Sequence, residues 1–171
     1  MHIRPQHLER HTLSVTVTNE PGILARIAGL FAGRGYNIES LTVAEMTEDD
    51  AVSRITVVTS GPQPVIEQII AQLDRLPPVH RVVDLTAQGP HVERELALVK
   101  VEGTGDRRIE AMRLAEVYRA RVVDATISSF IFEVTGGVDK IDKFLELMAQ
   151  VGLVEVARTG IAAIARGHET I

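Results

Sequence analysis

Two short segments contain residue types that could hold a zwitterion, a small molecule that carries both a carboxylate and an ammonium group. The first is Asn19–Leu24 (NEPGIL), and the second, one predicted helix later, is Gly35–Ser40 (GYNIES). Asn19 and Asn37 each have a side-chain amide that can donate and accept hydrogen bonds. Gly22 has no Cβ, so a ligand can come close to its backbone. These features predict a binding site for a free amino acid.

The first segment joins a predicted strand to a predicted helix, and the start of that helix should attract an anion. The first N–H groups of a helix lack partners within it, and with the helix dipole they favour an exposed negative charge by about 0.3–1 kcal/mol. Pro21 fits the first helical position, where its missing N–H costs nothing. Gly22 and Ile23 are therefore expected to offer the first free donors to a ligand carboxylate.

Apolar residues in and near the same segments suggest a slot for the side chain of the ligand. Leu24, Ile38 and Val43 are the residues expected to line it. A simpler interpretation stays open, because Pro-Gly also marks the start of helices and Asn37 also suits a turn. Spacing alone does not decide between a binding site and ordinary turn chemistry.

The elements that must position these segments are predicted twice in the chain. Alternating apolar residues, helical spacing and Gly or Pro breaks give the order β-α-β-β-α-β over residues 12–86 and again over 93–159. This order is typical of a ferredoxin-like module, an antiparallel sheet with both helices on one face. The expected fold class is α+β, with two ferredoxin-like βαββαβ modules in tandem. The expected strands are 12–18, 37–46, 52–59, 79–86, 93–102, 121–127, 129–135 and 153–159.

The break Gln88-Gly89-Pro90 is the expected boundary between two domains. We expect a flexible N-terminal extension over residues 1–10, a first domain over 11–87 and a second domain over 91–167. Modules this small bury only about 60% of their unfolded surface and are marginally stable. The outer face of the first sheet is rich in Thr and Ser, so we expect further packing there. Dimerisation through a sheet edge or face is the simplest route.

Composition excludes several classes of function. The formal net charge of -5 and the aromatic content of 4% argue against a nucleic-acid partner. The chain has no Cys, which excludes thiol catalysis, disulfides and cysteine-ligated metals. No apolar run approaches the roughly 20 residues that span a bilayer, and residues 1–11 lack the apolar region of a secretory signal. No membrane partner is expected, and the expected location is cytoplasmic.

No set of residues predicts catalysis by this chain. The six His are scattered without the spacing of a metal site, and we expect them to be solvated or packed. The acidic run Glu48-Asp49-Asp50 is expected to be a solubilising turn. Ser128-Ser129 has no His nearby in the sequence, and there is no nucleophile elbow. The expected catalytic and metal-binding residues are therefore none.

Several longer motifs repeat those of a known family. They are NEPGILAR (19–26), RGYNIESLTV (34–43), SRIT (53–56), HVERELALVK (91–100) and VEVARTG (154–160). With these motifs the chain closely resembles the small regulatory subunit of acetolactate synthase (acetohydroxyacid synthase), an ACT-domain family. The resemblance covers roughly residues 11–167, and the chain departs from the family pattern in the residues that precede the first strand.

The resemblance implies an N-terminal ACT domain, which is an effector-binding module, followed by a second ferredoxin-like domain. It implies a non-catalytic chain that binds the large catalytic subunit and raises its activity. Such a chain would also confer feedback inhibition by branched-chain amino acids, usually valine. Thiamine diphosphate, Mg²⁺ and FAD are expected on the catalytic subunit, and no cofactor is expected on this chain.

The resemblance also implies where the effector binds. In the family, two ACT domains pair as a homodimer and the effector lies at their interface. The matching positions here are Asn19 and Gly22 from one chain and Asn37, with the Ile38 backbone beside it, from the other.

Three alternatives are weighed against this interpretation. A stand-alone ACT-domain amino-acid sensor could regulate transcription or another biosynthetic enzyme, although the motifs of the second half argue against it. A small ferredoxin-like enzyme such as an acylphosphatase would need a catalytic Arg–Asn pair in a phosphate loop, and the first loop has no Arg. An RNA-binding module of the same topology is disfavoured by the acidic charge and the lack of aromatic residues on the strands.

Overall fold

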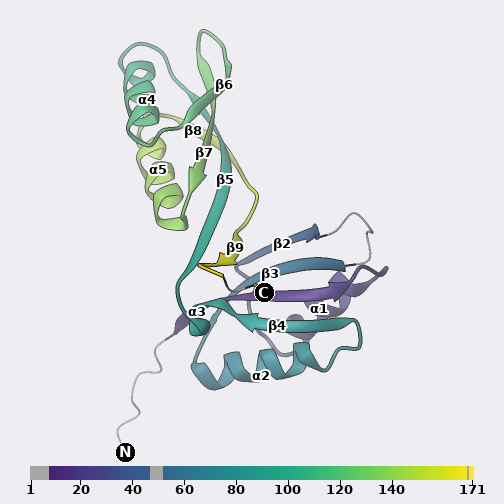
Figure 1. Cartoon of the computed structure of the whole chain (residues 1–171). Helices are drawn as coiled ribbons and strands as arrows, with labels where there is room; N and C mark the ends of the chain where they lie inside the picture. The colour runs from purple at the N-terminus through teal and green to yellow at the C-terminus, as the bar shows by residue number, and fades with distance from the viewer. Residues whose placement is uncertain (1–7, 47–51, 169) are drawn as a thin grey trace, which may run out of the picture. The chain divides into compact units, whose positions relative to one another are not determined.

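The chain forms two compact units, each with its own sheet and core (Figure 1). The first unit combines the residues up to Val92 with residues 161–171, and the second unit runs from Glu93 to Gly160. The computed structural model describes residues 8–46, 52–168 and 170–171. In this part of the chain, no helix is long and apolar enough to cross a membrane.

The first unit contains a four-stranded antiparallel sheet in the order β2-β3-β1-β4. Its elements are β1 Glu9–Thr18, α1 Ile23–Gly33, β2 Ser40–Glu45, β3 Val52–Gly61, α2 Gln63–Asp74, β4 Val79–Asp84 and the short helix α3 Leu85–Gln88. The order β-α-β-β-α-β predicted for this half of the chain is confirmed.

The alternation of residues along β1 creates the core of the first unit. Leu13, Val15 and Val17 point to one face of the sheet and are fully buried. Both long helices cover that face with residues at helical spacing, namely Ile23, Ile27, Phe31, Ile66, Ile69 and Leu73. Burying a side chain of this kind is worth roughly 1.5–3 kcal/mol, and a slip of one residue would turn the whole apolar set of β1 away from the helices.

The second unit repeats the topology with strands in the order β6-β7-β5-β8. Its elements are β5 His91–Glu102, whose first two residues belong to the first unit, α4 Asp106–Val117, β6 Arg121–Ala125, β7 Ser129–Gly136, α5 Val138–Val151 and β8 Leu153–Arg158. In its core, Phe132 and Phe144 are fully buried and meet edge to face, with ring centroids 6.4 Å apart. The two sheets together confirm the expected α+β class with two ferredoxin-like modules.

The first strand begins earlier than predicted. β1 starts at Glu9, which pairs with Gly61, and Arg10 pairs with Ser60. Residues 9 and 10 therefore belong to the sheet and not to the expected N-terminal extension. Their side chains are polar, but the ladder uses backbone groups and continues as far as the partner strand β3 does. Residues 1–7 and the predicted acidic turn lie outside the described residues.

One glycine of the second unit is required by a close approach of two backbones. Gly152 ends α5 with φ 127°, and a Cβ built there would lie 2.0 Å from the carbonyl oxygen of Glu102. The N–H of Glu102 also donates to the carbonyl of Gly152 at 2.8 Å. The contact ties the end of α5 to the end of β5, and no side chain fits between them.

We expect Gly152→Ala to lower the free energy of unfolding by about 3 kcal/mol or more, because the new methyl group collides with backbone and the left-handed φ adds strain. Equilibrium urea denaturation followed by circular dichroism measures the change. Gly137→Ala is the matched control, since Gly137 has φ -70° and no atom within 4 Å of a built Cβ. Its cost should stay below about 1 kcal/mol. Equal costs for the two variants would contradict the steric explanation.

The chain returns to the first unit at its C-terminal end, which the sequence did not predict. Residues 161–171, which we call the strap, include a short strand, β9 (Ala162–Ala165), that pairs with β5. The N–H of Arg166 donates to the carbonyl of Pro90 at 3.1 Å. The expected second domain reached residue 167, whereas the second compact unit ends at Gly160. The difference arises because side chains of the first sheet bond to the strap.

The strap lies on the face of the first sheet opposite α1 and α2. Ser40 and Thr42 of β2 alternate with the core residue Leu41, so their side chains point away from the helices. Both hydroxyls bond to the backbone of Ile161, which is 4% exposed. The polar outer face was expected to be covered by further packing, and part of that packing comes from the chain itself.

Two arginines of the same face hold the far end of the strap. Arg54 of β3 donates to the carbonyl oxygen of Ile171 at 2.6 Å. Arg81 of β4 donates to the carbonyl oxygen of Thr170 at 3.3 Å. The strap is therefore bonded to three of the four strands of the sheet, by side chains from β2, β3 and β4.

Candidate functional site

The turn between β1 and α1 differs in one detail from the prediction. Gly22 is the N-cap of α1, with φ 87° in the left-handed region, and the helix begins at Ile23. Pro21 is thus in the turn and not the first helical residue. A left-handed residue is needed there to redirect the chain, and glycine adopts that conformation without strain.

This turn changes which N–H groups are available to a ligand. The N–H of Ile23 donates to the carbonyl of Glu20 at 3.3 Å, so Ile23 is not the free donor that was expected. No side chain caps α1, which leaves the N–H groups of Leu24 and Ala25 at the open end of the helix. No atom lies within 4 Å of a Cβ built on Gly22, so the space before these donors is open.

Asn19 connects the ends of two strands beside this turn. It is exposed, and its Nδ2 donates to Oε1 of Glu45 at 3.0 Å. Asn19 directly follows β1, and Glu45 is the last residue of β2. The carboxylate of Glu45 is therefore held next to the turn, close to where an ammonium group would be attracted.

The second predicted segment is fixed at the beginning of β2. Gly35, two residues after the end of α1, has φ 69° in the left-handed region. The hydroxyl of Thr59 donates to the carbonyl of Asn37 at 2.6 Å, and the N–H of Glu39 donates to Val58 at 2.8 Å. Asn37 itself is exposed. The backbone is therefore held by β3, whereas the residue predicted to bind a ligand remains open to solvent.

Within one chain the two segments lie at opposite ends of the sheet. Asn19 follows Thr18, which pairs with Val52 at the first end of β3. Asn37 is bonded to Thr59, seven residues further along the same strand. At about 3.3 Å per strand residue, this places the segments roughly 23 Å apart along β3. A single small amino acid cannot contact both segments of one chain.

The residues predicted to line an apolar slot are open to solvent in the single chain. Leu24 is 41% exposed and Val43 is 45% exposed, while Ile38 is half-buried against the core. Val43 belongs to β2, an edge strand of the described sheet. An edge strand presents unpaired backbone groups that can pair with another chain. In the single chain these residues therefore do not enclose a slot.

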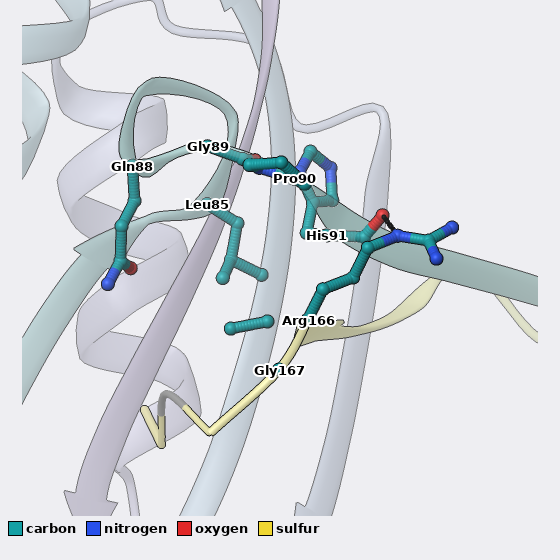
Figure 2. Close-up of a pocket in the computed structure, with 8 residues that line it drawn as sticks. Leu85, Gln88, Gly89, Pro90, His91, Arg166 and Gly167 are labelled. Carbon is teal, nitrogen blue, oxygen red and sulfur yellow. Dashed lines mark hydrogen bonds between the residues drawn. The ribbon is translucent and has the colours of Figure 1, made fainter.

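A separate hollow of about 200 Å³ lies between the strap and the connection from α3 to β5. Figure 2 shows Leu85 and Gln88 on one side and the Arg166 side chain extending away from them. The Nε of Arg166 donates to the carbonyl of His91 at 3.4 Å. Sequence reasoning missed this hollow, because its walls come from segments about 75 residues apart.

Titratable residues do not form a metal centre in the part of the chain that is described. No group of three His, Asp or Glu residues there is placed to hold a metal ion. His11 is buried, and its Nδ1 lies 2.7 Å from Oδ2 of Asp84, which also caps α3. This histidine is packed as part of the fold, consistent with the interpretation made for the scattered histidines.

Two family models match consecutive parts of the chain. The AHAS small subunit-like ACT domain matches residues 13–81, and the small subunit of acetolactate synthase matches residues 94–167. The first unit is thus an ACT domain, and the chain belongs to the acetolactate synthase small-subunit family. The resemblance inferred from the motifs is confirmed.

Individual relatives agree over nearly the full length. An acetolactate synthase small subunit of Aquifex aeolicus is 47% identical over 96% of this chain and 85% of its own. The acetolactate synthase isozyme 3 small subunit of Escherichia coli is 46% identical over 94% of this chain and 98% of its own. The crystal structure of the small subunit from Thermotoga maritima matches with a TM-score of 0.83 and 37% identity, covering 94% of this chain and 99% of that one.

Proposed function

We propose that this chain is a regulatory subunit that binds the catalytic subunit of acetolactate synthase, raises its activity and makes it sensitive to feedback inhibition by valine. The proposal is supported by family membership over both units and by the ACT domain. The reaction, in branched-chain amino acid biosynthesis, would be carried out by the partner with its thiamine diphosphate, Mg²⁺ and FAD. This chain would supply the effector site.

The effector site is proposed to lie between two copies of the ACT domain. The observation that carries this is the separation of Asn19 and Asn37 along β3. If two β2 edges pair about a twofold axis, the strands run antiparallel, and the start of one lies opposite the end of the other. Asn37 of the partner subunit would then approach the turn of Asn19 and Gly22. This arrangement would bring both halves of the predicted site together.

Each chemical group of the ligand then has a partner. Its carboxylate would accept hydrogen bonds from the N–H groups of Leu24 and Ala25, at the positive end of α1. Its ammonium would face the Glu45 carboxylate, which Asn19 holds in place. Its apolar side chain would occupy the slot lined by Leu24 and Val43 of one copy and Ile38 of the other. A small branched side chain suits these aliphatic walls.

Reconstitution tests the function directly. The chain is titrated into the purified catalytic subunit, and acetolactate formation is measured with and without valine, leucine and isoleucine. We expect activity to rise to a plateau at a fixed ratio of the two chains, and valine to lower that plateau. A catalytic subunit whose rate is unchanged by the chain, with or without the amino acids, would refute the proposal.

The dimer contact gives its own prediction. Val43 is next to the middle of β2, so Val43→Lys would bring two ammonium groups together across the twofold axis and should convert the dimer largely to monomer. Analytical ultracentrifugation measures the change, and valine binding should weaken by about tenfold or more with it. Val154→Lys, at a similarly exposed valine of β8, is the control and should remain dimeric. An unchanged dimer in Val43→Lys would exclude pairing through β2.

A further inference from the structure

The backbone of Ile161 is hydrogen-bonded to β2, the strand that follows Asn37 and Ile38 of the proposed effector site. Its N–H donates to Oγ of Ser40 at 2.9 Å, and its carbonyl accepts from the hydroxyl of Thr42 at 2.8 Å. Ser40, the first residue of β2, follows Ile38 by two residues, so the strand that holds the strap directly follows one half of the proposed site. A displacement of β2 on effector binding would therefore displace Ile161.

A second anchor fixes the chain just before the strap. Arg158, the last residue of β8, donates to both carboxylate oxygens of Glu95 at 2.7 Å and to Asp142 of α5 at 2.8 Å. Glu95 is buried, and its hydrogen bonds to the guanidinium raise the pKa of Arg158 above its usual range. Removing one member of such a pair leaves an uncompensated charge. The end of β8 is thus firmly held to β5 and α5.

The chain segment between the two anchors is short. The N–H of Thr159 donates to the carbonyl of Leu96 at 3.0 Å, so Thr159 still belongs to the second unit. Gly160, with φ 84°, is the only residue between Thr159 and Ile161. One residue spans at most about 3.6 Å. A shift of Ile161 must therefore either pull on Thr159 or break an anchor.

Beyond Ile161, the strap borders an unfilled space. The hollow of about 200 Å³ borders Ala165, Arg166 and Gly167, so this stretch lacks close contacts on one side (Figure 2). Packed interiors resist displacement, whereas a segment beside an unfilled space can move at a lower cost. Arg166 keeps its hydrogen bonds to the carbonyls of Pro90 and His91, but the unfilled space beside it leaves this stretch less tightly packed than the buried Ile161.

We propose that the strap is a coupling element, which passes a change at the effector site to the second unit through Ile161, Gly160 and Arg158. The proposal rests on the regulatory function proposed above, because it needs an effector that binds at β2. Coupling requires only that the effector bind the two positions of β2 with different affinity. The second unit would then respond although it contains no residue of the effector site.

Lengthening the connection separates binding from coupling. The test variant carries two additional glycines after Gly160, which adds roughly 7 Å of slack and leaves both anchors intact. The control variant carries the same two glycines after Ile127, at the exposed end of the β6–β7 hairpin. Valine binding to the free regulatory chain is measured by calorimetry, and valine inhibition is measured in the reconstituted holoenzyme.

We expect all three chains to bind valine within about threefold of one another. The variant lengthened after Gly160 should need at least tenfold more valine for half-inhibition, or lose inhibition, while the control resembles the parent. Unchanged inhibition in that variant would overturn the coupling role of the strap. Absence of valine binding to the parent chain would instead overturn the proposed function, so the two failures are distinguishable.

Hydrogen exchange gives a second readout that does not depend on the catalytic subunit. Saturating valine should change the exchange rate of the Ile161 amide severalfold in all three chains. The Thr159 amide, bonded to Leu96 in the second unit, should respond in the parent and the control but not in the chain lengthened after Gly160. An equal response of Thr159 in all three chains would overturn the proposal.

Discussion

Gly22→Asp is expected to weaken valine binding strongly, whereas Gly22→Asn should retain part of the affinity. The aspartate carboxylate would lie before the open N–H groups of Leu24 and Ala25, where the carboxylate of the ligand is proposed to bind. Two like charges about 4 Å apart repel by roughly 4 kcal/mol at an effective dielectric constant near 20. Even half of that value weakens binding by about thirtyfold relative to the asparagine variant.

The two substitutions form a matched pair. Asparagine and aspartate have nearly the same size, and both tolerate the left-handed φ of 87° better than other side chains do. No atom lies within 4 Å of the built Cβ, so neither side chain collides with the fold of the single chain. Any difference between them therefore reports charge.

Calorimetric titration of valine into each folded variant measures the difference, and valine inhibition of the reconstituted holoenzyme provides the functional readout. Equal affinities for the Asp and Asn variants would show that the ligand carboxylate does not bind at the start of α1. Circular dichroism melting curves should agree for the two variants within the small cost of the helix-capping change.

The sequence predicts the sheets because their apolar residues follow a local period. Leu13, Val15 and Val17 alternate in β1, and that pattern alone determines which face meets the helices. The strap has no such signal. Its strand is four residues of small and aliphatic type, and its partners Ser40 and Thr42 lie about 120 residues away. Only the three-dimensional structure reveals that this segment covers the first sheet.

At the candidate site, too, the sequence pattern did not predict how the backbone is arranged. Pro21 and Gly22 predicted a helix start with free donors, but the backbone of the turn uses the N–H of Ile23, so the available donors shift to Leu24 and Ala25. Local spacing also cannot tell how far apart two turns lie across a sheet. That distance follows from register, which depends on which strands pair.

Mixing two inactive variants should restore valine binding if the site is shared between copies. Gly22→Asp damages the turn, and Asn37→Ala removes the amide that the partner subunit would supply. In a mixed dimer one site contains both changes and the other contains neither. Random pairing of equal amounts makes half of the dimers mixed, so about one quarter of all sites should bind. Calorimetry of the mixture, after exchange of subunits, counts these sites.

The reciprocal mixture sharpens the test. A chain carrying both Gly22→Asp and Asn37→Ala is mixed with an equal amount of the parent chain. A shared site is then damaged in every mixed dimer, and only parent dimers bind, which again leaves about one quarter of the sites. A site contained within one chain would leave about one half in this mixture and none in the first. These paired outcomes distinguish the two arrangements. The shared site is the expected one, because β3 holds the two segments at opposite ends of each sheet.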